Sequence, residues 1–415
     1  MHPNILQKIL DCYIGSPLCF LLGGFQSRAA VRQRRAPQRI LLIQLSAIGD
    51  TILTIPTIRA IRNRFPNAHV AMVASSINLQ YLEGCPYIDQ YIPCRLEELM
   101  KSPRKLIAFI MGLRRQKFNW AIDFEHWPRL SALIAYGSGA SRRIGFRSAG
   151  QHRHYLFSDV VDHVPGQHEV INFLKIARLL GCPIRETNLE VWLKREDKDW
   201  TRGFFNEMGI DPNRPVVAIH PEAGRRGEPR RRLPHDRFVS VADALVERYN
   251  AQIILTGAPS EVELSQHIAS QTRAACAIAA GRTPINQLAA LFANADLVIC
   301  GNCGPMHLAA ATGTSVLALH GPTNPLQWGP WGHGHTILHV DVPCSPCLNL
   351  GFEYGCSALS DGTSPCMYTI QVDEVLKACE KYLINGQGES KRLGQQSIAD
   401  TEMVKCKQTS LPVAY

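Results

Sequence analysis

The chain has 415 residues, more than one ordinary domain core holds, so its length predicts two domains. Hydrophobic residues make up 46% of the chain and charged residues 19%, which is typical of a globular protein. The net charge is +9, but the basic runs contain no interleaved aromatic residues, which argues against a nucleic-acid partner. The 14 cysteines, some inside apolar segments, indicate reduced cytoplasmic thiols instead of a secreted disulfide framework.

Residues 1–38 are predicted to form an interfacial and basic N-terminal segment. Its uncharged stretch 12–27 has only about 16 residues and is interrupted by glycines and Pro17, whereas a membrane-spanning helix needs roughly 20 apolar residues. We therefore expect this stretch to lie in the membrane interface, with the arginines that follow it at the lipid head groups. A single membrane span and a solvated basic surface are the alternatives. The arginines are Arg28, Arg32, Arg34, Arg35 and Arg39.

A first α/β domain is predicted over residues 39–195. Residues 39–45 form a near-continuous apolar run, as expected for a parallel strand that is buried on both faces. Isoleucines spaced three apart predict a helix over 51–64. Further elements are predicted as strands at 69–75 and 120–124 and as a helix at 169–180.

A charged and polar stretch, 196–214, is predicted to link this domain to a second one over residues 215–385. The second domain again alternates strands and helices, and residues 386–415 are polar and aperiodic, which predicts a disordered tail. Its strands are predicted at 215–220, 252–256, 296–300 and 315–320. Its helices are predicted at 235–249, 260–270, 285–294, 306–311 and 372–383.

This alternation predicts two successive doubly wound, Rossmann-like domains that face a central cleft. In such sheets ligands bind at the carboxyl ends of the strands, so both domains should direct loops toward the cleft. Asp50 follows the first strand directly after Gly49, whose freedom of backbone would allow a sharp turn and a close ligand. The Asp50 carboxylate could accept a proton from a sugar hydroxyl, or it could cap the helix that begins at residue 51.

Three segments of the second domain are candidates for a phosphate-bearing ligand. The segment Gly301–His307 joins a strand to a helix, and the amides at such a helix start attract anions, although an ordinary turn is the alternative. Arg231 and Arg232, in the basic cluster 225–232, could neutralise a diphosphate or could form a solvated loop. Glu261, four residues after Gly257, could bind ribose or sugar hydroxyls or could complement its helix dipole.

Four cysteines near the C-terminus have one C-x-x-C pair followed by looser spacings. This pattern is weaker than two such pairs, so a structural zinc, free thiols and a labile disulfide all stay open. No catalytic role is assigned to them. The four are Cys344, Cys347, Cys356 and Cys366.

From Arg39 to about Leu383 the chain resembles the ADP-heptose:lipopolysaccharide heptosyltransferases and their relatives, glycosyltransferase family 9. Because the matching segments occur together and in the same order, the resemblance is specific. The segments are RILLIQLSAIGDTILTIPTIRAIRNRFPNAHV, AIDFEHWPRLSALIAYGSGASRRIGF, His168 ahead of the helix at 169–180, and VICGNCGPMHLAAATGTSVLALHGPTNP.

The resemblance implies a GT-B fold and an inverting transfer that needs no catalytic metal or cofactor. Asp50 falls on the family's proposed general base. Arg231 replaces a family lysine that contacts the donor diphosphate, and Asn302 replaces a family aspartate near the donor sugar. The residues and the resemblance together predict a donor site and an acceptor side. The donor site comprises Arg231, Arg232, Gly257, Glu261, Asn302, Gly304, Pro305, Met306 and His307, and the acceptor side comprises Ser46, Gly49 and Asp123.

The resemblance further implies an enzyme that moves heptose, or a related sugar, from an ADP-linked donor to a glycolipid acceptor such as the lipopolysaccharide core. Such an enzyme would act in the cytoplasm, peripherally on the inner membrane. Two alternatives stay open, the first because such enzymes share this architecture and the second because Asn302 removes a carboxylate beside the donor. One is another nucleotide-sugar enzyme of this fold, such as a non-hydrolysing epimerase, and the other is a non-catalytic sugar-binding protein.

Overall fold

The computed structural model describes residues 11–24, 36–223, 229–348, 356–384 and 402–406. The chain divides into two compact units, 1–187 and 188–415, so the division falls earlier than the predicted boundary. Most of the predicted linker 196–214 is a helix, α9 (Arg195–Met208), which packs on α12 (Ile285–Phe292) of the second unit. Its charged residues hide an amphipathic pattern, in which Phe204 is buried and stacks on Trp200.

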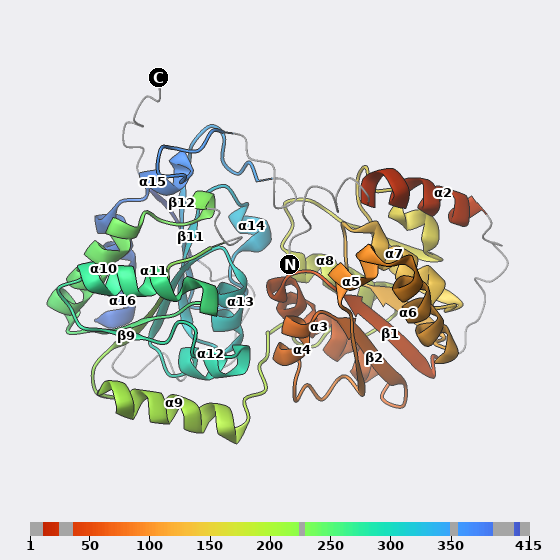
Figure 1. Ribbon diagram of the computed structural model, residues 1–415, viewed down its shortest axis with the longest axis horizontal. Helices are drawn as coiled ribbons and strands as arrows, with labels where there is room; N and C mark the ends of the chain where they lie inside the picture. Colours follow the sequence, from red (N-terminus) through yellow and green to blue (C-terminus); the bar gives the residue numbers. More distant parts are fainter. Residues whose placement is uncertain (1–10, 25–35, 224–228, 349–355, 385–401, 407–415) are drawn as a thin grey trace. The chain divides into compact units, whose positions relative to one another are not determined.

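The first unit contains a six-stranded parallel sheet in the order β3-β2-β1-β4-β5-β6 (Figure 1). The central strand β1 is the apolar run predicted from the sequence, and five of its six residues are buried. Helices cover both faces, as the doubly wound prediction requires. The strands are β1 Arg39–Gln44, β2 His69–Ala74, β3 Gln90–Pro93, β4 Trp120–Asp123, β5 Arg142–Arg147 and β6 Asp159–Asp162.

Helices α3 and α8 of this unit pack on each other. Helix α3 begins at Ile48, three residues before the predicted start, and runs through Pro56 to Arg64. The unit's helical elements are η1 Asp11–Gly15, α2 Ser16–Gly24, α3 Ile48–Arg64, α4 Ser76–Tyr81, α5 Leu96–Lys101, α6 Pro103–Arg115, α7 Arg129–Gly137, η3 Arg153–Leu156 and α8 Glu169–Leu179.

The N-terminal apolar stretch is helical over η1 and α2, and it docks on the first unit. Asp11 forms an ion pair with Arg129 of α7 at 3.0 Å, and Phe20 contacts Tyr155 edge-on at 5.5 Å between ring centroids. Across the described ranges, no helix combines the length and the apolar character that crossing a membrane requires. Of the predicted basic run, residues 28–35 lie outside the described residues, and Arg39 begins β1, where its guanidinium lies 5.5 Å from the Phe118 ring.

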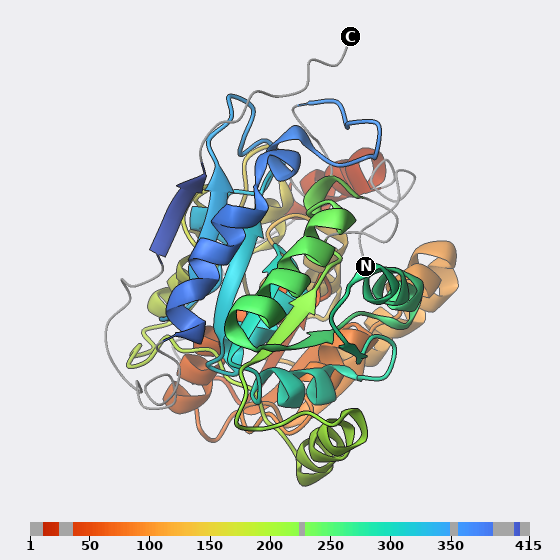
Figure 2. The same cartoon turned by 90° about the vertical axis from the view of Figure 1, so that its left-hand side faces the viewer.

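The second unit contains a seven-stranded parallel sheet in the order β13-β12-β11-β10-β7-β8-β9. Its edge strand β13 lies in the stretch predicted as a disordered tail, so that prediction is wrong for these five residues (Figure 2). The strands are β7 Val216–His220, β8 Gln252–Leu255, β9 Cys276–Ile278, β10 Leu297–Gly301, β11 Ser315–His320, β12 Thr336–Val340 and β13 Glu402–Cys406.

The core of the second unit lies between this sheet and the helices α10 and α16, which match the predicted helices at 235–249 and 372–383. Phe238 and Leu245 of α10 and Val375 of α16 are buried in it beside Val217 and Leu317. The unit's further helical elements are η4 Pro229–Arg231, η5 Pro259–Glu261, α11 Val262–Gln271, α13 Gly304–Ala311, α14 Pro325–Trp328 and α15 Pro365–Thr369.

Candidate active site

The turn between β1 and α3 is held by Glu125, a buried residue that follows β4. The Glu125 carboxylate accepts hydrogen bonds from the backbone N–H groups of Leu45 and Ser46, both at 2.6 Å, and from the Ser46 hydroxyl. The side-chain amide of Gln44 donates to the same carboxylate at 3.2 Å. Ser46, which was predicted on the acceptor side, is partly exposed as a residue. Its hydroxyl, however, already donates to Glu125 within the turn.

Asp50 lies in the first turn of α3, directly after this turn. The N-cap of α3 is Ala47, so the alternative in which Asp50 caps the helix is wrong. Gly49 is buried inside the helix, and the chain turns before it, at residues 45–47, rather than at Gly49. The N-terminal end of the helix dipole still favours a negative charge at Asp50.

The electrostatic surroundings of Asp50 suit a proton acceptor. Burial away from water raises the pKa of Asp50 well above its usual range, and the negative charges of Glu125 and Glu169 raise it further. As a whole residue, Asp50 is nevertheless only partly buried. A carboxylate whose pKa is raised holds a proton more strongly, and it is a better general base once it is ionised.

Asp123 and Arg153 form a fully buried ion pair behind the turn, and both side chains have 0% exposure. Arg153 also donates to the backbone carbonyl of Glu125 and to the Ser131 hydroxyl, the latter at 2.9 Å. Burial raises the pKa of Asp123 to about 7, although the Arg153 charge acts in the opposite direction. Asp123 therefore lies inside the unit, which corrects its prediction as an acceptor-side residue.

Arg231 and Asn302 are brought together at the end of β10. Arg231 Nη2 donates to the backbone oxygen of Asn302 at 2.6 Å and to its side-chain oxygen at 2.8 Å. The Asn302 side-chain amide donates to the carbonyl of Trp328 at 2.8 Å, which an aspartate could not do. A Cβ atom at Gly301 would lie 2.6 Å from Ala223 Cβ, so this close approach requires glycine.

Arg232 and Glu222 form a second charged pair in this unit. Arg232 Nη1 lies 3.0 Å from a carboxylate oxygen of Glu222, and both side chains are largely buried. Burial raises the pKa of Glu222, which the Arg232 charge counteracts. Arg225 and Arg226 of the same basic cluster lie outside the described residues.

Glu261 lies next to Gly257, where a Cβ atom would come within 3.1 Å of the Glu261 carboxylate. The carboxylate accepts a hydrogen bond from the Ala258 N–H at 2.7 Å, which fits its alternative role at the helix start. His220 Nε2 lies 4.0 Å from Glu261. Burial lowers the pKa of His220 to about 4, so the imidazole is neutral near pH 7.

The loop after β10 offers fewer anion-binding amides than predicted. Helix α13 begins at Gly304, Pro305 has no N–H, and the Met306 N–H donates to the Cys303 carbonyl at 3.2 Å. Of the three residues Gly304, Pro305 and Met306 at the predicted helix start, two therefore have no backbone N–H available to a phosphate. Met306 and His307 have buried side chains, so neither side chain offers an exposed donor contact in this structure.

The four C-terminal cysteines lie near one another. The Cys356 thiol is hydrogen-bonded to Cys344, and burial together with Cys344 and Cys347 raises the pKa of Cys356 to about 11. Burial and the other three thiols raise the pKa of Cys366 to about 12. The structural zinc stays a prediction.

Sequence reasoning missed several residues that shape these sites. Glu125 and Glu222 each come two residues after a strand end, the same kind of position that drew attention to Asp50. This position after a strand end could have identified both carboxylates as candidate site residues. Arg153 lies in a short helix between two strands, and no motif marks it.

Comparison with known proteins identifies the family. The family model described as "Glycosyltransferase family 9 (heptosyltransferase)" matches residues 106–357, which is more than half of the 415-residue chain. The lipopolysaccharide core heptosyltransferase OpsX of Haemophilus influenzae is 24% identical over 311 residues, covering 74% of this chain and 85% of that protein. Lipopolysaccharide heptosyltransferase 2 of Escherichia coli is 24% identical over 314 residues, covering 73% and 88%.

Solved structures agree with this assignment at the level of the fold. A glycosyltransferase family 9 protein from Veillonella parvula has a TM-score of 0.67 at 22% identity, and the match covers 84% of this chain and 97% of that one. The E. coli ADP-heptose lps heptosyltransferase II has a TM-score of 0.65 at 22% identity, with 84% and 100% covered. The GT-B fold class predicted from the sequence is therefore confirmed, and the chain belongs to glycosyltransferase family 9, the heptosyltransferase family, and is a glycosyltransferase.

Proposed function

We propose that the chain transfers a heptose from ADP-heptose to a hydroxyl of a lipopolysaccharide-core or related glycolipid, with inversion at the anomeric carbon. The family match supports the reaction class. The observation that carries the mechanism is the partly exposed Asp50, whose pKa is raised by burial, Glu125 and Glu169. No step of the proposed transfer requires a cofactor.

In this mechanism the acceptor hydroxyl gives its proton to Asp50 while its oxygen bonds to the anomeric carbon. The bond from that carbon to the diphosphate oxygen breaks on the opposite face, and ADP leaves with the electron pair. A positioned base typically contributes about 10²–10⁴-fold to the rate. Positive charge near the departing diphosphate lowers the barrier further, and Arg231 of the second unit is the proposed source of that charge.

The proposal is tested by incubating the purified full-length chain with ADP-heptose and a deacylated core acceptor that lacks heptose. We expect ADP release that depends on the acceptor, and a product heavier by one heptosyl group in mass spectrometry. UDP-linked sugars serve as the control donors. Equal ADP release with and without acceptor would indicate hydrolysis and contradict the transfer.

Arg231→Ala is expected to weaken the binding of ADP by about 10–100-fold, because a charge-assisted hydrogen bond contributes about 1.5–3 kcal/mol. Isothermal titration calorimetry with ADP measures the change. Arg273→Ala, at a side chain that is 81% exposed in the same unit, is the matched control and should bind ADP like the wild type. An Arg231→Ala chain with unchanged ADP affinity would refute the diphosphate contact.

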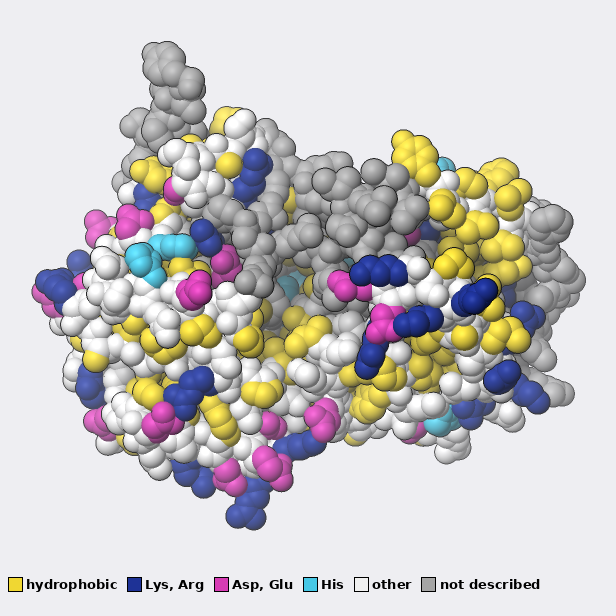
Figure 3. All heavy atoms as spheres, viewed as in Figure 1, with side chains coloured by type: hydrophobic (Ala, Val, Ile, Leu, Met, Phe, Trp, Pro, Cys, Tyr) yellow, Lys and Arg dark blue, Asp and Glu magenta, His cyan; other side chains and the backbone are white. Residues whose placement is uncertain are grey.

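We further propose that the first unit rests on the cytoplasmic face of the inner membrane. Helical residues of η1 and α2 expose large apolar side chains, and Figure 3 shows apolar side chains gathered over this region beside basic ones. Ile107 and Met111 of α6 are also exposed, and the same helix carries exposed Arg104 and Arg115. The exposed side chains of η1 and α2 are Tyr13, Ile14, Leu18, Phe20 and Leu21.

The double change Phe20→Ser with Leu21→Ser should weaken binding to anionic lipid vesicles by at least about tenfold. The reason is that burying one such side chain fully contributes about 1.5–3 kcal/mol. Vesicle flotation with phosphatidylglycerol-containing liposomes measures the bound fraction. Leu326→Ser, at a side chain that is 63% exposed in the second unit, is the control. Equal flotation of the double variant and the control would count against this surface.

A further inference from the structure

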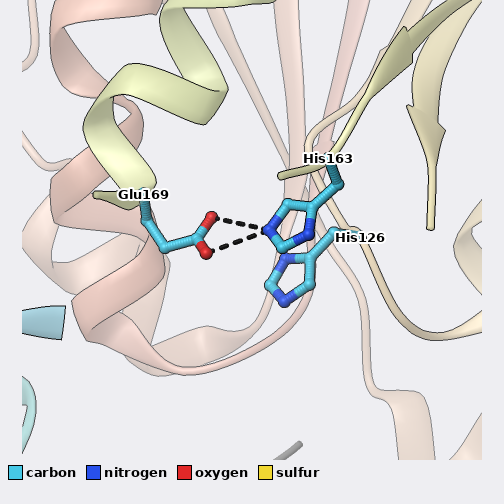
Figure 4. A group of neighbouring side chains, drawn as sticks. All are labelled: His126, His163 and Glu169. Atoms are coloured by element: carbon cyan, nitrogen blue, oxygen red, sulfur yellow. Dashed lines mark hydrogen bonds and ion pairs between the residues drawn. The ribbon is translucent and has the colours of Figure 1, made fainter. Parts of the chain in front are cut away.

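Two histidines and a glutamate converge in the first unit, close to the proposed base. His126 follows β4, His163 follows β6 directly, and Glu169 is the first residue of α8. One ligand atom from each lies within 4.8 Å of the other two (Figure 4). Three separate segments of the chain thus supply nitrogen and oxygen ligands to one point.

The spacing of these atoms fits a metal ion. His163 Nε2 lies 2.9 Å and 3.1 Å from the two carboxylate oxygens of Glu169. Neighbouring ligands on a transition metal with bonds near 2.1 Å are about 3.0–3.4 Å apart, so the separation already suits a coordination sphere. The His126 ring lies parallel to that of His163, with centroids 4.5 Å apart, and a rotation about its side-chain bonds would turn a nitrogen toward the same point.

Burial and charge favour a cation at this place. The Glu169 carboxylate has 0% exposure, and a buried carboxylate is costly unless a positive charge compensates it. A dication satisfies Glu169 together with both imidazoles. As whole residues, His126 and His163 have intermediate burial, and the His163 side chain is 8% exposed.

We propose that His126, His163 and Glu169 bind one divalent transition-metal ion, with coordination positions left open for water or an oxygen ligand. Two imidazoles and one carboxylate favour zinc, iron(II) or cobalt(II) over magnesium or calcium, which prefer ligands made of oxygen alone. Three protein ligands with open positions are the pattern of metal sites that exchange ligands, whereas structural zinc sites are closed by four.

The site lies beside the part of the unit that carries Asp50. Helices α3 and α8 pack together, and the Glu169 charge acts on Asp50. A bound dication would cancel the repulsion that Glu169 exerts on an ionised Asp50. This consequence rests on the proposed function, whereas metal binding itself does not.

The test is a cobalt(II) titration of the full-length chain by calorimetry and visible absorption. Cys344→Ser with Cys347→Ser forms the parent background, because the thiols could bind cobalt themselves. We expect one cobalt ion per parent chain and no thiolate charge-transfer band. His126→Gln and Glu169→Gln, each made in the parent, should weaken binding at least about tenfold, since even second-shell changes cost about 10–100-fold.

His154→Gln, a histidine of the same unit outside the trio, is the matched control and should bind cobalt like the parent. Circular dichroism checks that each variant folds, and if Glu169→Gln does not, His126→Gln decides alone. A parent chain that binds no cobalt, or ligand variants that bind it as the control does, would overturn the proposal. Failure of heptose transfer would leave a positive titration standing, so the two proposals fail separately.

Discussion

Asp50→Asn is expected to reduce heptosyl transfer by about 10²–10⁴-fold, which is the range that a positioned general base contributes. Asparagine has nearly the same shape but cannot take the proton of the acceptor hydroxyl. Because Asp50 belongs to the first unit and the proposed ADP contacts to the second, ADP binding should stay within about twofold of the wild type. Initial rates at saturating donor, together with calorimetry for ADP, separate the two effects.

The same variant should be more stable than the wild type at neutral pH. Asp50 has a folded-state pKa above its unfolded value, so the folded state binds more protons between these two values. Stability contributed by this group is therefore lost as the pH rises from the unfolded pKa to the folded one. Asparagine does not titrate and avoids that loss, so Asp50→Asn should melt at a higher temperature than the wild type. The variant would thus gain stability while losing activity.

The wild-type rate should rise with pH through the raised pKa of Asp50, because the base acts when it is ionised. The residual rate of Asp50→Asn should lack this rise. Asp199→Asn, at a side chain that is 45% exposed on α9, is the matched control and should keep both the rate and its pH dependence. An Asp50→Asn chain that turns over like this control would remove Asp50 from the mechanism.

Arg153→Met is expected to lower the free energy of unfolding by about 3–5 kcal/mol, because it leaves the fully buried Asp123 without its cation. Arg153 also donates to the Glu125 carbonyl, and Glu125 holds the turn that precedes Asp50. Urea denaturation followed by circular dichroism measures the change. Arg95→Met, at a surface side chain that is 74% exposed, should change stability by no more than about 0.5 kcal/mol.

The loss of unfolding free energy caused by Arg153→Met should grow as the pH rises. Burial raises the pKa of Asp123 to about 7 even with Arg153 present, and removing the guanidinium raises it further. The variant therefore continues to lose stability above pH 7, where the wild type no longer does. Adding Asp123→Asn removes the buried charge but keeps the oxygen that accepts from the Glu125 N–H at 3.0 Å. The double variant should recover most of the loss, and a failure to do so would show that Arg153 acts by packing alone.

The alternation of apolar runs and helical patterns predicted the parallel sheets because the central strands are buried on both faces. β1 and β10 are the clearest examples, since nearly every residue in them is buried. Reading elements from apolar patterns failed at 196–214, because helix α9 buries only a narrow face among many charged residues. It also failed at β13, where five residues of a polar segment pair with β12.

Asp50 could be proposed as the base because its position after a strand end is local information. Its surroundings were not found, because Glu125 reaches Leu45 across 80 residues of chain and Arg153 reaches Asp123 across 30. Periodicity describes neighbours along the chain and says nothing about such pairs. Asn302 is a similar case, since its amide is explained by a Trp328 carbonyl that the loop sequence does not reveal.

By itself the sequence determined the two doubly wound α/β domains, the family and the position of Asp50, because these depend on hydrophobic periodicity and on contiguous motifs. The tertiary structure alone decided that Asp123 is an interior partner of Arg153, that the Met306 N–H is already used, and that His126, His163 and Glu169 meet. The physical reason is that burial and charge pairing are properties of groups brought together by folding. A side chain's chemistry is fixed by its type, but its pKa and its partners are fixed by what packs around it.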